Sequence, residues 1–313
     1  MIKAAILNDT TRDVGHIGCR AVIGNLRKIC AAKNWSIELC DRNCREFAAD
    51  EYRDSLSGID VVVLNGEGSL HDDKGTIWLQ KAQIAKEAGK KCFLVNAVWQ
   101  NNPQNKRYLE LFDAISARES FSYQQMLADG AKNAFSVPDL SFYGFGTEVL
   151  PATDNSNRKL AFTDSTLKSL TAELAVFAAK YKAPLFFLYE KQFNKYRANW
   201  LNRLRQLWRG NEVLHLDNAD KLAGFAKLIS GRYHADCFAL MYGIPFTAIY
   251  SNTWKVEALL TDAGLSDFYI GKNDNLSAKI ADFIDEKMPF NREKSFEYSR
   301  KAKAAIEDFY RNL

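Results

Sequence analysis

The sequence predicts an α/β protein built from two doubly wound, Rossmann-like domains. Short apolar segments typical of buried parallel strands alternate with helical segments almost from end to end. This alternation pauses once, in a stretch rich in Gly, Pro and Asn that indicates a linker. With 313 residues, 47% of them hydrophobic, each half is long enough to bury a core of its own.

The first half contains six candidate strands with helices between them. The strands are expected at Lys3–Leu7, Ser36–Leu39, Asp60–Leu64, Lys91–Asn96, Ala114–Ala117 and Ala134–Val137, and the helices over 17–34, 76–89, 104–112 and 120–129. Alternating strands and helices of this kind form a parallel sheet covered on both faces. We expect the N-terminal domain to span residues 1–147.

The alternation resumes after the linker at Tyr143–Asn157. A C-terminal domain of residues 155–290 is expected, and the polar helix in 291–313 can pack back on the N-terminal domain. Two such domains facing each other across a cleft give a GT-B-like arrangement, with ligands at the carboxyl ends of the strands. The expected strands are Leu160–Thr163, Leu185–Leu188, Val213–Leu216, Lys227–Ile229 and Phe246–Ile249.

Composition and charge exclude several classes of protein. A net charge of only +4 argues against a dedicated nucleic-acid binder but suits an anionic small molecule. No apolar run reaches the length of a membrane span, and the first residues lack the apolar core of a signal peptide, so we expect a cytoplasmic protein. Six scattered cysteines without a CxxC pair indicate free thiols and predict no metal site.

Two glycine-bearing loops follow strands of the first half. Gly15-His16-Ile17-Gly18 opens a helix, where backbone N–H groups can meet an anion, although tight strand–helix packing also explains the glycines. The loop from Gly66 to His71 allows close approach of a ligand or a neighbouring strand, and Glu67 and His71 add titratable groups. A tight turn with incidental polar residues is the alternative. We expect substrate contacts from His16, Gly66, Gly68 and His71.

Arg118 stands where the fifth strand becomes a helix, a position suited to binding a carboxylate or phosphate. A structural salt bridge, with Glu119 or between the domains, is the alternative. Asp139, at the end of the domain's last strand, is expected to cap the turn that follows.

The second half carries the sharpest motif. Ser230-Gly231 ends a buried strand, and Arg232 and His234 follow at the start of a helix that stops at Gly243-Ile244-Pro245. The next strand delivers Lys255 to the same edge of the sheet. Arg232, His234 and Lys255 therefore converge on one anion site, in which a protonated His234 can act as a general acid.

The segment 191–208 combines an apolar stripe at helical spacing with surrounding Lys and Arg residues. A helix packed on its sheet explains this pattern. The alternative is peripheral contact with anionic lipid at the inner face of a membrane, or with a lipid-linked acceptor.

Taken in order, these motifs resemble the polysaccharide pyruvyl transferase family. The resemblance rests on the Gly-x-x-Gly helix opening, Gly-Glu-Gly-Ser-Leu-His, Ser-Ala-Arg-Glu-Ser, Pro-Asp-Leu-Ser-Phe, Ser-Gly-Arg-Tyr-His-Ala, Gly-Ile-Pro and the lysine after the next strand, and it covers roughly residues 5–265. The helix opening departs from the family, because Gly-His-Ile-Gly-Cys-Arg stands where many members have Gly-Asp-Glu after the middle residue.

The resemblance implies transfer of the enolpyruvyl unit of phosphoenolpyruvate onto two hydroxyls of a sugar, which makes a cyclic ketal and releases phosphate. It implies that Arg118, Arg232 and Lys255 clamp the donor, that His234 is the proton donor or the partner of the leaving phosphate, and that Glu67 or Asp9 is the base. No cofactor or metal is needed, and the acceptor is a free or lipid-linked saccharide.

Two competing functions remain open. A glycosyltransferase using a nucleotide-activated, possibly acidic, sugar would need a base-and-ribose pocket, which Thr163–Ser165 and Tyr189–Lys191 could line. A non-catalytic binding protein is the third reading. Similar folds host many chemistries, so the fold by itself does not choose among these functions.

Overall fold

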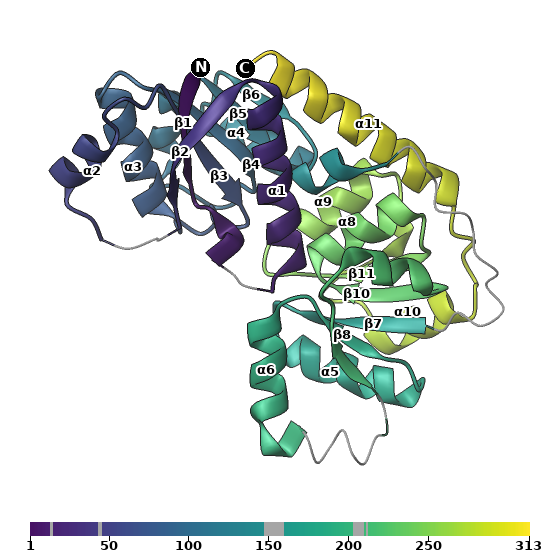
Figure 1. Cartoon of the computed structure of the whole chain (residues 1–313). Coiled ribbons are helices and arrows are strands. Elements are labelled where there is room, and N and C mark those ends of the chain that lie inside the picture. The colour runs from purple at the N-terminus through teal and green to yellow at the C-terminus, as the bar shows by residue number, and fades with distance from the viewer. Residues whose placement is uncertain (13–14, 43–45, 147–159, 203–209, 211) are drawn as a thin grey trace. The chain divides into compact units, whose positions relative to one another are not determined.

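The computed structural model describes residues 1–12, 15–42, 46–146, 160–202, 210 and 212–313 (Figure 1). The chain divides into two compact units. Unit 1 consists of Met1–Arg12, Ala21–Tyr143 and Ala302–Leu313, and unit 2 of Asp13–Arg20 and Gly144–Lys301. Each unit is built on a parallel six-stranded sheet, so the doubly wound α/β fold predicted from the sequence is confirmed.

The sheet of unit 1 has the order β2-β1-β3-β4-β5-β6, with every neighbouring pair parallel. Every residue of β3 is buried, as expected for a strand covered on both faces. The strand order reverses between β1 and β3, which makes this the switch point of the sheet. The strands are β1 (Ile2–Leu7), β2 (Trp35–Asp41), β3 (Val61–Glu67), β4 (Lys91–Ala97), β5 (Ala114–Ala117) and β6 (Ala134–Ser136).

The helices of unit 1 largely follow the predicted pattern, with two differences. The helix α2 (Ala49–Ser55) was not predicted, and the segment expected as a helix over 104–112 is a 3-10 helix, η2 (Lys106–Leu111). The Asp73 carboxylate accepts the amides of Gln104 and Asn105, so the helix begins only at Lys106. The resulting η2 is 6 residues long. The other elements are α1 (Ile17–Ala32), α3 (Thr76–Glu87), α4 (Ser120–Ala128), η1 (Thr10–Arg12) and η3 (Leu140–Gly144).

The sheet of unit 2 has the order β12-β11-β10-β7-β8-β9, again parallel throughout. Its switch point lies between β7 and β10. The short strand β12 was not predicted. The strands are β7 (Leu160–Ser165), β8 (Leu185–Phe187), β9 (Val213–His215), β10 (Lys227–Gly231), β11 (Phe246–Ile249) and β12 (Tyr269–Ile270).

The remaining helices belong mainly to unit 2, and α11 continues into unit 1 from Ala302. They are α5 (Lys168–Lys180), α6 (Glu190–Ala198), η5 (Ala219–Gly224), α8 (Tyr233–Tyr242), α9 (Lys255–Asp262), η6 (Ser266–Phe268), α10 (Leu276–Ile284) and α11 (Arg292–Arg311).

The predicted continuous helix over 191–208 is interrupted. Helix α6 ends at Ala198, and Asn199 is extended, with its side-chain oxygen accepting the amides of Leu201 and Asn202. An asparagine that bonds the following backbone in this way competes with helix continuation. Residues 203–209 of the predicted segment lie outside the described residues.

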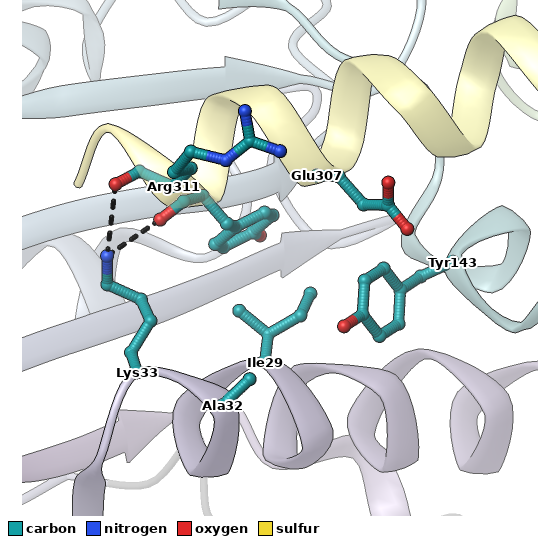
Figure 2. Close-up of a pocket in the computed structure, with 7 residues that line it drawn as sticks. Ile29, Ala32, Lys33, Tyr143, Glu307 and Arg311 are labelled. Atoms are coloured by element: carbon teal, nitrogen blue, oxygen red, sulfur yellow. Dashed lines mark hydrogen bonds between the residues drawn. The ribbon is translucent and has the colours of Figure 1, made fainter.

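The end of α11 is fixed within unit 1 by α1. The Lys33 ammonium donates to the carbonyl oxygens of Tyr310 at 2.8 Å and Arg311 at 3.5 Å, which caps the last turn of α11 (Figure 2). A cavity of about 360 Å³ lies beside this cap, with Ile29 and Tyr143 in its lining. Among the described residues, no helix is long and apolar enough to cross a membrane.

Candidate active site

Polar residues gather at the carboxyl ends of the strands that flank each switch point. In unit 1 these are the residues after β1 and at the end of β3, and in unit 2 those at the end of β7 and after β10. In open parallel sheets, ligands bind at this edge beside the reversal of strand order. We describe the two edges separately.

Buried amides hold the switch point of unit 1 together. The Asn8 side chain donates to the Asn65 carbonyl at 2.6 Å and to the Ser69 hydroxyl at 3.2 Å. Asn65 donates in return to the Asn8 carbonyl and to the Glu67 carboxylate, both at 3.3 Å. Asn8 (φ 59°) and Glu67 (φ 39°) both have left-handed backbones, which are strained for residues with a Cβ. The hydrogen bonds of this network hold Asn8 and Glu67 in these backbone conformations.

The carboxylate of Asp9 is fully buried and fully engaged. Thr11 donates to Oδ1 from its amide at 3.0 Å and its hydroxyl at 2.6 Å, while Arg27 and Arg42 reach Oδ2 at 3.1 and 3.3 Å. Burial alone would raise the pKa of Asp9, but these hydrogen bonds and cations outweigh it and lower the pKa. A carboxylate so stabilised is a poor base, which favours Glu67 over Asp9 for that role.

The two glycines that flank Glu67 lack a side chain for different reasons. A Cβ on Gly66 would lie 2.5 Å from the Cβ of Ala97, so the close approach is to the neighbouring strand β4. A Cβ on Gly68 would lie 3.7 Å from a terminal nitrogen of Arg118. The loop therefore brings Gly68 against the guanidinium, while Gly66 serves the packing of the sheet.

Arg118 is 2% exposed and forms a buried ion pair with Asp139 at 3.2 Å. Asp139 also accepts the amide of Ser141 at 2.9 Å, which confirms the expected cap. Glu119 instead caps α4 by accepting the amide of Ser122 at 2.9 Å. Arg118 therefore takes part in a buried salt bridge, as the structural alternative expected, and Asp139 is a partner in it.

His71, the remaining predicted residue of unit 1, is buried, with Nδ1 at 2.8 Å from the Asp72 carboxylate. Its backbone pairs with Gln100 beyond β4, which fixes the loop to the neighbouring strand end. The tight-turn explanation for this loop therefore has structural support. Its role toward a substrate stays a prediction.

In unit 2, the guanidinium of Arg232 spans the switch point. Its Nε donates to Oδ1 of Asp164 at 2.9 Å, and Nη2 bonds both Oδ2 of Asp164 and the side-chain oxygen of Gln192. Asp164 is the next-to-last residue of β7 and Arg232 follows β10, so this fork-like pair ties the two strands together. Gly231 permits the approach, because a Cβ there would lie 2.7 Å from the Asp164 carbonyl.

His234 and Lys255 lie at the starts of α8 and α9, which follow the adjacent strands β10 and β11. Both side chains are nearly buried, at 8% and 7% exposure. The Lys255 ammonium donates to the Asn252 side chain at 2.9 Å. A Cβ on Gly18 would fall 2.2 Å from the imidazole of His234, so the absence of a side chain at Gly18 makes room for this ring.

The segment around His16 also belongs to unit 2, although sequence order assigns it to the first domain. The rings of His16 and His234 are 5.8 Å apart and meet edge to face. Burial, followed by the charges of His234, Arg232 and Lys255, lowers the pKa of His16 well below its usual value. These four side chains therefore share one electrostatic environment.

Two acidic residues complete this environment. Asp164 was considered from sequence only as part of a nucleotide pocket, and Asp236 was not singled out. Asp236 is fully buried in the first turns of α8, and burial raises its pKa well above the usual value, which Ser230 and Lys255 only partly offset. A polar residue at the end of an apolar strand was the available signal for Asp164. Within the described ranges, no group of three His, Cys, Asp or Glu side chains could hold a metal ion.

Similar solved structures share this fold. The putative UDP-N-acetylglucosamine 2-epimerase from Listeria monocytogenes has a TM-score of 0.62 at 11% identity, over 100% of this chain and 97% of its own. The UDP-GlcNAc 2-epimerase from Methanocaldococcus jannaschii, in complex with UDP-GlcNAc and UDP, has 0.61 at 12%, over 99% of both chains. MurG from Acinetobacter baumannii has 0.52 at 11%, over 100% of both. At these identities the likeness establishes the GT-B-type fold alone.

No curated protein sequence matches the chain. The model of one protein family, described as polysaccharide pyruvyl transferase, matches residues 12–253. The match includes His16, Arg232 and His234, ends just before Lys255, and covers most of the chain. It confirms the resemblance inferred from the ordered motifs and establishes an enzyme of polysaccharide biosynthesis. This chain belongs to the polysaccharide pyruvyl transferase family.

Proposed function

We propose that the enzyme takes its pyruvyl group from phosphoenolpyruvate and transfers it to two hydroxyls of a sugar, forming a cyclic ketal and releasing phosphate. The observation that carries this proposal is the shared environment of His16, Arg232, His234 and Lys255 at the carboxyl edge of the unit 2 sheet. Burial, followed by the charges of the other three groups, lowers the pKa of His16, as expected for a positive, confined site.

The charges suit a donor with a carboxylate and a phosphate. Lys255 supplies a compact charge at the start of α9, and the positive end of α8 points to the same edge of the sheet. Arg232 uses Nε and Nη2 for Asp164 and Gln192, so the remaining nitrogen, Nη1, is the one proposed to meet the donor. Asp164 holds the guanidinium in place before the donor arrives.

The proposed chemistry begins with protonation of the donor's methylene carbon by His234. The electrons of the C2–C3 double bond form the new C3–H bond, and C2 becomes an oxocarbenium-like centre. The first sugar hydroxyl adds to C2 and gives its proton to a base. Phosphate then leaves with the C2–O bond electrons, the second hydroxyl adds to C2, and its proton restores His234. The proton taken by the base leaves with the phosphate or passes to water.

For the acceptor, we propose a sugar of a polysaccharide precursor, free or lipid-linked. Trp200 (66% exposed) and Leu201 (43% exposed) lie just past the basic last turn of α6, and this combination supports contact with an anionic membrane surface. Co-sedimentation with vesicles containing anionic lipid tests this contact. The proposed membrane contact is wrong if Trp200→Ser and the parent protein sediment equally with the vesicles.

Calorimetric binding of phosphoenolpyruvate, compared with a panel of nucleotide sugars, tests the donor without knowledge of the acceptor. We expect phosphoenolpyruvate to bind and Lys255→Met to weaken it by tenfold or more, since about 1.4 kcal/mol corresponds to a factor of ten. Arg232→Ala and His234→Ala should also weaken it. The exposed Lys272 gives a matched control, because Lys272→Met should leave the affinity unchanged.

Binding of a nucleotide sugar in place of phosphoenolpyruvate would overturn the proposed donor. In that case the site would serve glycosyl transfer. A loss of affinity in Lys272→Met as large as in Lys255→Met would show that general charge, and not the described cluster, attracts the donor.

A further inference from the structure

We propose that His16 is a neutral hydrogen-bond donor of the anion site, with its tautomer fixed by the first turn of α1. It follows that His234 is the member of this histidine pair that carries the transferable proton. The identity of the donor in this inference rests on the proposed function, but the state of His16 does not.

The backbone of α1 fixes which ring nitrogen of His16 is protonated. His16 directly precedes α1, and its carbonyl accepts the amide of Arg20 at 3.1 Å as the first helical hydrogen bond. The amide of Cys19 donates to Nδ1 of the ring at 3.3 Å, so the imidazole caps the helix. A nitrogen that accepts an amide N–H carries no proton, and the proton of the neutral ring is therefore on Nε2.

The segment that carries His16 is anchored to the strand ends of unit 2. The amide of Ile17 donates to the Leu188 carbonyl at 3.4 Å, and Nε2 of His215 donates to the Gly15 carbonyl at 2.9 Å. Arg20 bonds the carbonyl of Asp217. These bonds come from both sides of His16, so the ring is held against His234 and, at 5.6 Å, Tyr189.

A second proton on His16 is unfavourable for three reasons. It would replace the Cys19 hydrogen bond by a clash between two donors, it would place a cation at the positive end of α1, and it would add to neighbouring positive charge. Burial, followed by the charges of His234, Arg232 and Lys255, lowers the pKa of His16 well below its usual value, and a hydrogen bond with its own backbone offsets only part of this shift. The other charged or titratable groups near this segment are Glu190, against Gly15, and Asp164, His215, Asp217 and Tyr189.

A neutral imidazole can donate a hydrogen bond from Nε2 without being able to lose its proton at working pH. His16 therefore binds an oxygen of the anionic donor and stays out of proton transfer. The ring of His234, on α8, lies 5.8 Å from the ring of His16. With His16 neutral, His234 is the ring of the pair that can give a proton to the donor carbon.

Two isosteric substitutions separate the two functions of the ring. The amide nitrogen of Gln reaches the position of Nε2, so His16→Gln keeps the donor but loses the helix cap. Asn places its polar atoms near Nδ1 and is a strong N-cap, so His16→Asn keeps the cap and loses the donor. We expect phosphoenolpyruvate affinity to stay within about threefold in His16→Gln and to fall tenfold or more in His16→Asn, while Tm changes in the opposite order.

The inference is overturned if binding follows stability, with His16→Asn retaining affinity and His16→Gln losing it. The pH profile of kcat gives an independent readout. The fall in kcat at high pH, where the general acid loses its proton, should persist in His16→Gln and vanish in His234→Gln. Loss of that fall in His16→Gln would assign the proton to His16 instead.

Histidine resonances of the parent protein provide a test that needs neither variant to fold. By ¹⁵N NMR, one of the four histidines should remain neutral with Nε2–H from pH 5.5 to 8.5, both free and with phosphoenolpyruvate or inorganic phosphate bound. Four histidines that all titrate in this range would sink the inference. A protein that binds phosphate but not phosphoenolpyruvate would contradict the proposed donor. In that case the NMR tautomer of His16 would still decide this inference.

Discussion

The switch points of the two units have the same topology and opposite chemistry. In unit 1, the polar residues after β1 and at the end of β3 are amides and carboxylates, and Asp9 accepts two hydrogen bonds from Thr11 and pairs with two arginines. In unit 2, a carboxylate at the end of β7 meets an arginine after β10, and two histidines and a lysine surround the pair. The edge of the sheet provides the location, while the residues just past each strand provide the function.

The comparison also separates two uses of a buried carboxyl group. Asp9 collects hydrogen bonds and cations that keep it ionised, and its pKa is lowered. Asp236 is equally buried, but neither of its oxygens has a hydrogen-bond partner of good geometry among the described residues, and its pKa is raised. Because the raised pKa of Asp236 disfavours its ionised form, Asp236 offsets less of the positive charge of Lys255 than an ordinary carboxylate would.

The largest expected effect comes from breaking the buried ion pair of each unit. Asp164→Asn in unit 2 and Asp139→Asn in unit 1 each leave a buried arginine without its counter-charge, which typically costs about 3–5 kcal/mol. Both should lower the free energy of unfolding, as measured by urea denaturation. Only Asp164→Asn should also weaken the binding of inorganic phosphate, because Asp164 holds the Arg232 guanidinium in place.

Asp50, 92% exposed at its side chain and paired with Arg53, provides the control for these variants. Asp50→Asn should leave the urea midpoint unchanged, because a solvated pair contributes little. If Asp164→Asn behaved like Asp50→Asn, the Arg232 pair would not be the structural tie between β7 and β10.

The next effect isolates the room made for His234. In Gly18→Ala, the new Cβ would meet the imidazole at 2.2 Å, so His234 must move and donor affinity should fall by about tenfold, or 1.4 kcal/mol. Gly24 lies on the same helix with nothing within 4 Å of its Cβ position. Gly24→Ala should keep the affinity and stabilise the helix by up to about 1 kcal/mol. Equal affinity in the two variants would contradict the placement of His234.

Asp9→Asn tests the saturated carboxylate of unit 1. Because the folded pKa of Asp9 lies below the unfolded value of 3.8, its stabilisation is present above that value and is lost as the pH falls through the folded pKa. Asp9→Asn should therefore cost about 1–3 kcal/mol at pH 7, and progressively less toward pH 3. A cost that does not change with pH would show that shape, and not charge, makes Asp9 stabilising.

Asp236→Asn should have the smallest effect and the opposite sign. With a folded pKa above 3.8, the acid favours folding fully only below that value, and this contribution is lost as the pH rises toward the folded pKa. The neutral amide avoids that loss, so Tm should rise slightly at pH 8 and match the parent protein near pH 4. A lower Tm at pH 8 would mean that Asp236 is ionised and paired in solution.

Much of this architecture follows from the sequence because parallel strands need apolar residues on both faces. Ala114–Ala117 and Phe246–Ile249 were predicted residue for residue. The predictions were weakest where side chains bond the local backbone, as at Asn199, which ends α6, and in the Asp73 loop before η2. Such bonds depend on local side-chain and backbone geometry, which the spacing of apolar residues along the sequence does not reveal.

For the site, the sequence alone determined which residues follow the strands, and hence Arg232, His234 and Lys255 as neighbours at one edge. Only the tertiary structure decided their partners. It paired Arg232 with Asp164 and Arg118 with Asp139, and it assigned His16 to unit 2. The physical reason is that strand order and contacts between distant segments arise when the sheet assembles, whereas the pattern along the chain records only what each segment buries.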